Sequence, residues 1–477
     1  MEVLGYGMAS TAGPKDLSEN MREDEVKRKF RQQRSGLLLR ALDYSHIFSP
    51  MGLALCFVVS YYTVSRYLLI RTVIDSSAWW TPDSLVCVIL GLSSTLTSLP
   101  PFGYAIAICW PIRSFELVSK PKIRQFDRLF FCLVTRGENV DTILCTIENW
   151  PKLRQVNSRI RFQIIIDREI REELKRQVPD FVEVLLVPKD FAPPKAMYKA
   201  RALEFARLAQ QLTSDDWVLH LDEETQLDEF AVRACLDFIE RGDRHFAMGT
   251  ILYNSVSHWS SSFLTVGEIA RITDDFGRFR LPFKLRHRPH LGYIHGSFIM
   301  INGEIENAIT WDTNCMTEDF WFGYRAANRG YKFGWLNAIA REQPPRTIND
   351  VWAQRKRWFS GIWACNVLLA RLSYIGCVTF LISLAYHGYV IFIREEPLII
   401  PRWMFIWGIF GCGEGMWATI VSTTMQDFDH GGISVPAMVW HVVQAFALTP
   451  IFRAMESCIV VDAILFPPKS FHVVAKV

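Results

Sequence analysis

The chain has 477 residues, of which 50% are hydrophobic and 21% charged, and its formal net charge is only +3. With a mean hydropathy of +0.12, it is long and apolar enough for a globular domain together with membrane helices, which is not typical of a purely soluble protein. The small net charge argues against nucleic acid as a partner. Its 11 cysteines show no CxxC or Cys/His spacing, which argues against a zinc site and a disulfide framework and favours reduced thiols on a cytosolic face.

The N-terminal part of the chain changes from polar to strongly apolar near residue 49. Residues 1–48 lack the apolar stretch of a secretory signal, so we expect a disordered cytosolic tail. Two apolar runs follow, at 49–71 and 84–110, and each is long enough to cross a bilayer. We therefore predict two transmembrane helices within residues 49–112, the second one kinked at Pro100 and Pro101.

After Arg113, short apolar runs alternate with amphipathic segments, as in an α/β domain. Each run is continuously apolar, which is typical of buried parallel strands; the runs are 129–134, 162–166, 184–187, 217–221 and 246–251. Helical patterns at 195–212 and 229–241 separate some of them. The alternation predicts a doubly wound open sheet in a cytosolic domain over residues 113–354, with ligands at the carboxyl ends of the strands. Asp167 and Asp222 each follow directly on a predicted strand, so both are expected to face that crevice.

The last quarter of the chain is again strongly apolar. Residues 355–372 mix aromatic, aliphatic and basic residues, like a helix at the membrane interface. Within residues 373–425, the runs 374–393 and 403–424 predict two more transmembrane helices. Arg453, Glu456 and Asp462 interrupt the run 436–466, so for residues 426–477 we expect a second interfacial helix followed by a loop. Basic residues beside these runs predict that the tail, the domain and the C-terminus are cytosolic in a multi-pass protein of the ER, Golgi or plasma membrane.

Four short motifs occur in one order along the chain, and together they contain the groups needed to transfer a sugar from a nucleotide. A carboxylate positions the nucleoside, and an acidic cluster holds a divalent cation against the diphosphate. A base deprotonates the acceptor hydroxyl, and a cationic and aromatic element binds diphosphate and sugar. In chain order the motifs are Asp167, Asp222-Glu223-Glu224, Thr317-Glu318-Asp319 and Gln354-Arg355-Lys356-Arg357-Trp358.

Each motif also has a purely structural interpretation. Asp167 could cap a helix over 168–176, and residues 222–224 could be a solvated strand end. Residues 317–319 could be the first turn of a helix through Ala327, and residues 355–358 a basic patch with an aromatic anchor at the membrane edge. His295 alone is more often a core histidine than a functional one. The joint order of the motifs favours the catalytic interpretation.

From residue 129 to the C-terminus, the chain resembles membrane-embedded members of glycosyltransferase family 2, and it is similar to cellulose and hyaluronan synthases and to egghead-type β-1,4-mannosyltransferases. Residues 199–203 (KARAL) match the family's KAxAL helix, and residues 220–225 (HLDEET) resemble the egghead-type DxD motif, with Glu224 in place of the second Asp. Residues 293–297 (YIHGS) resemble the FFCGS acceptor motif, with His295 in place of Cys. Residues 470–476 (SFHVVAK) are similar to the FxVTxK gating loop, with Val474 in place of Thr.

The resemblance implies a GT-A type fold inserted between transmembrane helices and a role for each matching residue. The base would be Asp319, beside Glu318, while Asp222 and Glu224 would hold Mg²⁺ or Mn²⁺. The residues implied in donor binding are Asp167, Lys199, Asp222, Gln354, Arg357, Phe471 and Lys476. Those implied in acceptor binding are His295, Gly296, Ser297 and Trp358.

The reaction implied is inverting transfer of a hexose from GDP-mannose or a UDP-hexose to a lipid-linked, glycan or other membrane-associated acceptor, which gives a β-linkage. A processive β-polysaccharide synthase has the same catalytic residues but continues past the gating loop into further channel-forming helices. This chain stops at Val477, so we expect it to transfer a single sugar. From a different class, a membrane transporter or non-catalytic scaffold is favoured only by Glu414, which lies inside a predicted span. The sequence does not identify the donor or the acceptor.

Overall fold

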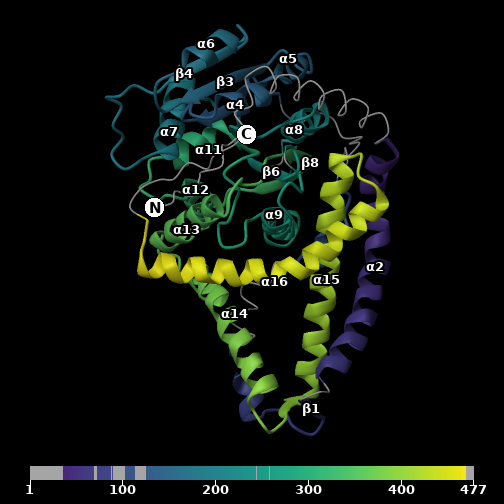
Figure 1. Ribbon diagram of the computed structural model, residues 1–477. Helices are drawn as coiled ribbons and strands as arrows, with labels where there is room; N and C mark the ends of the chain where they lie inside the picture. The colour runs from purple at the N-terminus through teal and green to yellow at the C-terminus, as the bar shows by residue number, and fades with distance from the viewer. Residues whose placement is uncertain are drawn as a thin grey trace, which may run out of the picture.

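The computed structural model describes residues 36–68, 72–86, 89, 103–112, 125–242, 244–256 and 258–468. Within them, a mixed α/β domain lies against a group of long helices (Figure 1). Most of the predicted tail, most of the predicted second span at 84–110 and all of the predicted gating loop at 470–476 fall outside the described residues.

Seven strands form the central sheet, in the order β4-β3-β2-β5-β7-β6-β8. Their bounds are β2 Leu129–Thr135, β3 Ile160–Ile166, β4 Val182–Leu186, β5 Trp217–Asp222, β6 Phe246–Leu252, β7 Ile299–Asn302 and β8 Phe333–Arg341. The five predicted strands are all present, and each has bounds within two residues of the prediction. The prediction lacks β7 and β8; β7 is antiparallel to both of its neighbours, β5 and β6.

Helices cover both faces of this sheet because the side chains of each strand point alternately to two cores. In β2, Phe131 and Leu133 belong to the core that includes α4, α5 and α8, whereas Cys132 and Val134 belong to the core that includes α7, α11 and α12. The doubly wound open sheet is therefore confirmed. The helices of the domain are α4 Val140–Ile147, α5 Trp150–Arg154, α6 Glu172–Gln177, α7 Lys199–Gln210, α8 Glu229–Arg241, α11 Gly303–Ile309 and α12 Glu318–Asn328.

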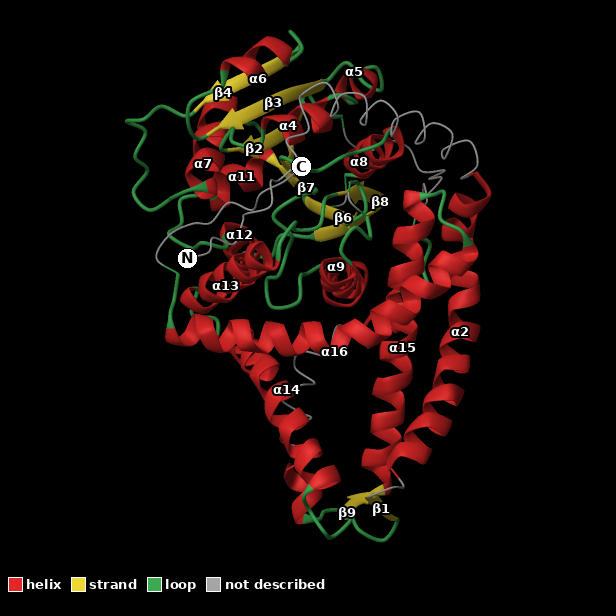
Figure 2. Cartoon of the chain, viewed as in Figure 1, coloured by secondary structure: helices red, strands yellow, loops and turns green. Residues whose placement is uncertain are grey.

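Four more helical segments lie on the side of the domain that faces the long helices. They are α9 Ser262–Asp274, the π-helix η1 Asp275–Arg280, α10 Leu281–Arg286 and α13 Ile348–Ala364. α9 and α13 both contact the long helix α16, and Figure 2 shows α16 running across beneath the domain. These two helices thus connect the domain to α16, and β8 also contacts α15 directly through the ion pair of Arg341 with Asp429 at 2.7 Å.

The long helices are α2 Gly36–Leu68, α14 Leu368–Phe392, α15 Arg402–His430 and α16 Val435–Leu465. In the described part of the chain, four stretches are long and apolar enough to cross a membrane: Ile47–Arg66, Leu368–Val390, Arg402–His430 and Val435–Leu465. α2 packs closely along α15, because a Cβ atom at Gly413 would lie 2.5 Å from the ring of Phe57. The short strands β1 Thr72–Asp75 and β9 Leu398–Pro401 pair at the end of the long helices far from the domain (Figure 2).

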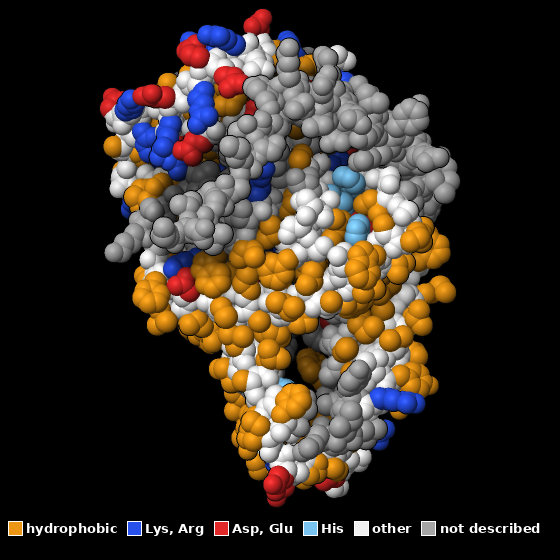
Figure 3. Space-filling view, viewed as in Figure 1, with side chains coloured by type: hydrophobic (Ala, Val, Ile, Leu, Met, Phe, Trp, Pro, Cys, Tyr) orange, Lys and Arg blue, Asp and Glu red, His pale blue; other side chains and the backbone are white. Residues whose placement is uncertain are grey.

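The surface of the molecule differs between the long helices and the α/β domain. Hydrophobic side chains cover the long helices, including α16, whereas charged side chains gather over the end of the α/β domain that lies away from these helices (Figure 3). Exposed apolar residues of α16 include Val435, Val439, Trp440, Val443 and Phe446. The domain boundaries and the membrane topology inferred from the sequence stay predictions.

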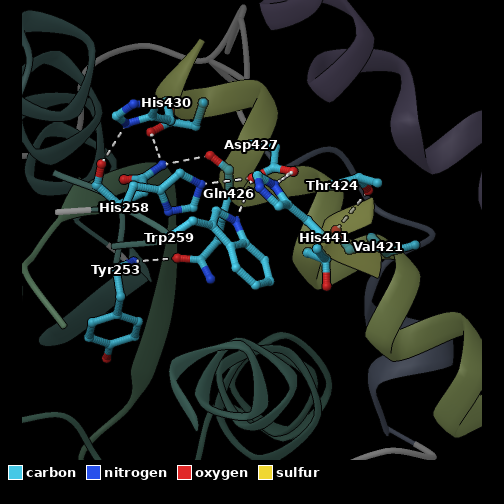
Figure 4. Close-up of polar contacts among 12 residues, drawn as sticks. Tyr253, His258, Trp259, Val421, Thr424, Gln426, Asp427, His430 and His441 are labelled. Atoms are coloured by element: carbon cyan, nitrogen blue, oxygen red, sulfur yellow. Dashed lines mark hydrogen bonds and ion pairs between the residues drawn. The ribbon is translucent and has the colours of Figure 1, made fainter. Parts of the chain in front are cut away.

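Asp427, near the end of α15, joins the domain to the long helices (Figure 4). Its Oδ1 is hydrogen-bonded to His258 Nε2 at 2.8 Å and to Trp259 Nε1 at 2.9 Å, both in the segment after β6. Its Oδ2 is hydrogen-bonded to His441 Nδ1 of α16 at 2.8 Å. The Trp259 ring also stacks on the His441 ring, with their centroids 4.1 Å apart. One buried carboxylate therefore holds three segments together.

Candidate functional site

A cavity of about 580 Å³ lies between the sheet and the long helices. It contains every predicted site residue that the structure describes: Asp167, Lys199, Asp222, Glu224, His295, Gly296, Ser297, Glu318, Asp319, Gln354, Arg357 and Trp358. Phe471 and Lys476 lie outside the described residues. Residues from across the sequence thus converge on one space, and the role of each stays a prediction.

Asp167 follows β3 directly, and its carboxylate pairs with Arg201 of α7. The Arg201 guanidinium is held in turn by the carbonyl oxygens of Phe191, at 2.8 Å, and Pro188, at 2.5 Å. α6 begins only at Glu172, so the alternative in which Asp167 caps a helix over 168–176 is wrong. Burial raises the pKa of Asp167 although Arg201 opposes this shift.

Lys199, the first residue of α7, connects three of the motifs. Its Nζ pairs with the Asp222 carboxylate, donates to the Gly296 carbonyl oxygen at 2.8 Å and lies 3.9 Å from Glu318 Oε1. Burial opposes its positive charge, but the carboxylates of Asp222 and Glu318 outweigh burial and raise the pKa of Lys199. A Cβ atom at Gly296 would lie 3.1 Å from Asp319 Oδ2 and 3.4 Å from Lys199 Nζ, so a side chain at 296 would crowd both groups.

The acidic motif at the end of β5 is largely buried. Asp222 and Glu224 line the cavity; Glu224 is only 8% exposed, so the interpretation as a solvated strand end is wrong for Glu224, whereas the Asp222 side chain is 35% exposed. The carboxylate of Glu223 instead accepts hydrogen bonds from the side chains of Thr135 and Asn139. Burial, together with the charge of Glu224, raises the pKa of Glu223 to about 7. All three acids thus line the cavity, and the carboxylate of Glu223 is held by two neighbouring side chains.

A further acid, Glu342, follows β8 and lies close to this motif. Burial and the negative charges of Glu224 and Asp222 raise its pKa to about 7. Its Oε1 accepts a hydrogen bond of 2.8 Å from Thr225 Oγ1, which is 2.6 Å from Ser297 Oγ. Clustered carboxylate oxygens suit a hard divalent cation, although no three potential ligands already converge on one point in the described part of the chain. No local sequence pattern marks Glu342, and the prediction lacks it.

Thr317-Glu318-Asp319 opens α12, as the helical interpretation expects, and its two acids face the cavity. Burial and the charge of Asp319 raise the pKa of Glu318 to about 7, against the opposing charges of Lys199 and Arg357. Burial also raises the pKa of Asp319, whose Oδ1 accepts a hydrogen bond of 2.7 Å from its neighbour's backbone N–H. A base works best when its pKa lies near the working pH, so burial suits both carboxylates for proton transfer.

The basic motif lies inside α13, which corrects the expected interfacial helix over 355–372. The helix begins at Ile348 and ends at Ala364, and α14 starts separately at residue 368. Arg357 Nη1 donates to the Met316 carbonyl oxygen at 3.2 Å, and burial lowers its pKa although three nearby carboxylates oppose this. The buried Gln354 Oε1 has no hydrogen-bond partner among the described residues. Both side chains line the cavity.

Two guanidinium groups lie over the Trp358 ring, that of Arg355 at 4.2 Å and that of Arg271 at 5.0 Å from its centroid. On another part of the wall, His295 Nε2 lies 2.6 Å from Asp275 Oδ1, at the start of the π-helix η1. The prediction lacks both Arg271 and Asp275. An acid in a π-helix beside a predicted site residue is the kind of local irregularity often found at functional sites.

The cavity extends to the long helices. Its lining includes Ser373, Tyr374 and Cys377 of α14 and Glu456, Ile459 and Val460 of α16. Tyr293, in the segment that resembles the acceptor motif, is hydrogen-bonded through its hydroxyl to Ser373 Oγ at 3.2 Å. The wall at this end is therefore built partly by helices that are themselves candidate membrane spans.

Comparison with known proteins agrees with the family resemblance of the sequence motifs. Residues 217–426 match the family model described as "Glycosyl transferase family group 2". The chain is 31% identical over 250 residues to Beta-1,4-mannosyltransferase egh of Drosophila melanogaster, which covers 49% of this chain and 52% of that protein. It is 31% identical over 267 residues to Beta-1,4-mannosyltransferase bre-3 of Caenorhabditis elegans, which covers 52% of this chain and 54% of that protein. These relatives confirm the egghead-type resemblance, and the chain spans about half of their length.

Among solved structures, the chain is similar to one described as Mannosyltransferase PcManGT from Pyrobaculum calidifontis in complex with GDP-Man and Mn²⁺. That similarity has a TM-score of 0.42 and 13% identity, and it covers 80% of this chain and 98% of that chain.

Proposed function

We propose that this chain, whose residues 217–426 match the glycosyl transferase family group 2 model, transfers a hexose from a nucleoside diphosphate donor to a membrane-associated acceptor and inverts the sugar to give a β-linkage. The observation that carries the proposal is the single cavity in which Lys199, Asp222 and Asp319 meet residues of α13, α14 and α16. Mannose is the first sugar to test, because the relatives are named β-1,4-mannosyltransferases. GDP-mannose is then the first donor, and a UDP-hexose is the alternative.

The donor binds along the carboxyl ends of the strands. Asp167 contacts the nucleobase, and Lys199, Gln354 and Arg357 hold the diphosphate, for which a planar guanidinium is well suited because it can donate two hydrogen bonds at once. Gln354 can donate to the diphosphate only through its Nε2 amide group; its buried, unpartnered Oε1 is an acceptor and suits a hydroxyl group of the bound donor.

Asp222 and Glu224 are the residues that would hold Mg²⁺ or Mn²⁺. Burial, and then the charges of Glu224 and Asp222, raise the pKa of the neighbouring Glu342 to about 7; a cation would relieve the repulsion among these acids. When bound, such an ion stabilises the charge that develops on the departing diphosphate.

Asp319 is the general base in this proposal. It takes the proton of the acceptor hydroxyl as that oxygen bonds to the anomeric carbon and the bond from that carbon to the diphosphate breaks. The acceptor sugar packs on Trp358 and contacts the segment from His295 to Ser297 on another part of the wall. Burial raises the pKa of Asp319, while the positive charges of Lys199 and Arg357 oppose this shift.

The part of the cavity that reaches α14 and α16 supports a membrane-associated acceptor. A lipid-linked sugar can remain in the bilayer while its terminal hydroxyl reaches Asp319, because Cys377, Ile459 and Val460 form an apolar edge between the two. A soluble glycan acceptor would not require this edge.

The test is a transfer assay with full-length protein in detergent, a divalent cation, a panel of nucleotide sugars and lipid-linked or free glycan acceptors, in which released nucleoside diphosphate is measured. We expect release with one donor class, and its loss in Asp319→Asn. Asp180→Asn is the matched control, because Asp180 is an exposed carboxylate outside the cavity. Release that survives in Asp319→Asn, or an α-linked product, would contradict the proposal.

A further inference from the structure

Tyr198, the residue immediately before α7, has a backbone conformation that is strained for its side chain. Its φ is 56° and its ψ is −130°, a region that glycine adopts readily but that is costly for a tyrosine. Such strain persists only where the surrounding structure holds it in place, and it is often found at functional sites. The fold therefore places a tyrosine where the backbone alone would favour glycine.

Hydrogen bonds on both sides of Tyr198 hold this conformation. The carboxylate of Asp312 accepts hydrogen bonds of 2.8 Å from the backbone N–H groups of Lys195 and Ala196. The Tyr198 carbonyl oxygen accepts a hydrogen bond of 3.1 Å from the backbone N–H of Arg201, in the first turn of α7. Because the chain is held before and after Tyr198, the point from which its side chain projects is fixed.

Tyr198 lines the cavity and is 36% exposed, so a large aromatic side chain is available there to a ligand. Arg201, which pairs with Asp167, lies three residues further along α7, and residues three apart share one side of a helix. Asp167 is the residue proposed to contact the nucleobase. Lys199, next to Tyr198 in the chain, pairs with Asp222 and is proposed to hold the diphosphate. Tyr198 therefore belongs to the part of the cavity proposed for the donor.

We propose that the Tyr198 ring stacks on the nucleobase of the donor and helps to select the nucleotide. This inference rests on the proposed function, because it assigns a further residue to the same donor site. An aromatic ring suits this role since every base has a flat π-face. The Asp167 carboxylate, an acceptor, would meet N–H groups at the edge of the same base. A purine has a larger face than a pyrimidine, so stacking favours GDP over UDP.

A glycine at position 198 separates binding from strain. Glycine has no Cβ atom and adopts a positive φ without strain, so it should not lower the unfolding temperature. It also removes the aromatic ring, so it should weaken nucleotide binding. If Tyr198 had only a structural role, its replacement would destabilise the protein and leave nucleotide affinity unchanged.

The experiment measures binding of GDP, UDP and inorganic pyrophosphate to full-length protein in detergent with Mn²⁺, by titration calorimetry, together with thermal unfolding. Tyr198→Gly is expected to weaken GDP binding by roughly 10-fold or more and UDP binding by less. Pyrophosphate binding should be unchanged because this ligand has no base, and the unfolding temperature should stay equal or rise. Tyr198→Phe, which keeps the ring, should retain most of the GDP affinity.

Gln211→Gly is the matched control. Gln211 follows the other end of α7, has a φ of 48° and does not line the cavity. Its replacement removes a positive φ from a residue with a side chain, as Tyr198→Gly does, but should leave all three affinities unchanged.

Unchanged GDP affinity in Tyr198→Gly, or an equal loss of affinity for pyrophosphate, would overturn the stacking. Equal losses for GDP and UDP would overturn the selection between bases. Binding is measured without sugar transfer, so two failures are distinguishable. A protein that binds GDP equally well with and without the Tyr198 ring refutes this inference alone, whereas a protein that binds none of the three ligands refutes the proposed donor site and this inference with it.

Discussion

Replacing Asp427 is expected to weaken the junction between the α/β domain and the long helices. The residue is 1% exposed, and its two oxygens are hydrogen-bonded to His258, Trp259 and His441 at 2.8 to 2.9 Å (Figure 4). Asp427→Ala removes the acceptor from all three side chains at once and leaves their N–H groups in place.

The loss of stability in Asp427→Ala depends on how well water can reach each of the three side chains that lose their acceptor. The His258 side chain is 1% exposed, whereas that of His441 is 15% exposed, so only part of the lost hydrogen bonding is recovered from solvent. A buried donor left unpaired costs about 1–3 kcal/mol, and with one such group fully buried and two partly so we expect a loss of roughly 2–4 kcal/mol. For a domain of this size, that lowers the unfolding temperature by roughly 4–16 °C.

Thermal unfolding in detergent, followed by tryptophan fluorescence, measures this loss. Asp427→Asn is the matched variant, because its carbonyl oxygen can still accept from His258 and Trp259, and its shift should be less than half that of Asp427→Ala. An unchanged unfolding temperature in Asp427→Ala, or equal shifts in the two variants, would refute the reasoning that this carboxylate holds the segments together.

The remaining predictions concern the cavity. Asp319→Asn should reduce turnover by ~10² to 10⁴ while donor affinity, measured by nucleotide binding, changes little; equal losses in both would indicate a structural role. EDTA, or Asp222→Ala, should abolish transfer, because metal stabilisation of a leaving group is worth several kcal/mol; full activity in EDTA would exclude the metal. Because the pKa of Glu318 is raised from 4.5 to about 7, the folded protein binds the extra proton between these values, so its stability should fall as the pH rises through this window. Glu318→Gln should flatten that dependence in unfolding scans, and an unchanged slope would argue against the shift.

The strands that the sequence predicts are those whose apolar residues run without interruption. β7 is missed because it has only four residues and is followed at once by α11 at Gly303. β8 is missed because Gly334 and Asn337 interrupt its pattern; both are tolerated inside the sheet. A Cβ atom at Gly334 would lie 2.5 Å from Phe238 of α8, so this glycine allows helix and strand to approach closely, a tertiary reason that no local pattern contains.

The site residues also fall into those that a local sequence pattern predicts and those that only the fold brings to the cavity. Asp222 ends a strand and Asp319 opens a helix, so their positions follow from local patterns. Glu342 and Asp275 face the cavity only because β8 and η1 are placed there by the fold, and their neighbours in sequence show no motif. The start of α13, in contrast, had a usable signal: Thr347 Oγ1 accepts a hydrogen bond of 3.1 Å from the Asp350 backbone N–H, and a threonine in that position is a typical N-cap.

α16 is a helix for which hydropathy alone does not decide between crossing a membrane and lying along it. Its composition suits a transmembrane span, yet its acids pair with α13 of the domain: Asp462 Oδ2 with Lys356 Nζ at 2.7 Å, and Glu456 Oε1 with Arg355 Nε at 3.6 Å. Charged side chains are unfavourable at the centre of a bilayer, while the opposite side of the helix exposes apolar residues such as Val443. Mean hydropathy averages over the charged face and the apolar face of α16. Only the contacts in the structure show that these are two different faces. We infer that α16 lies along the membrane surface with its apolar face in the lipid, which would bring the acceptor end of the cavity to that surface.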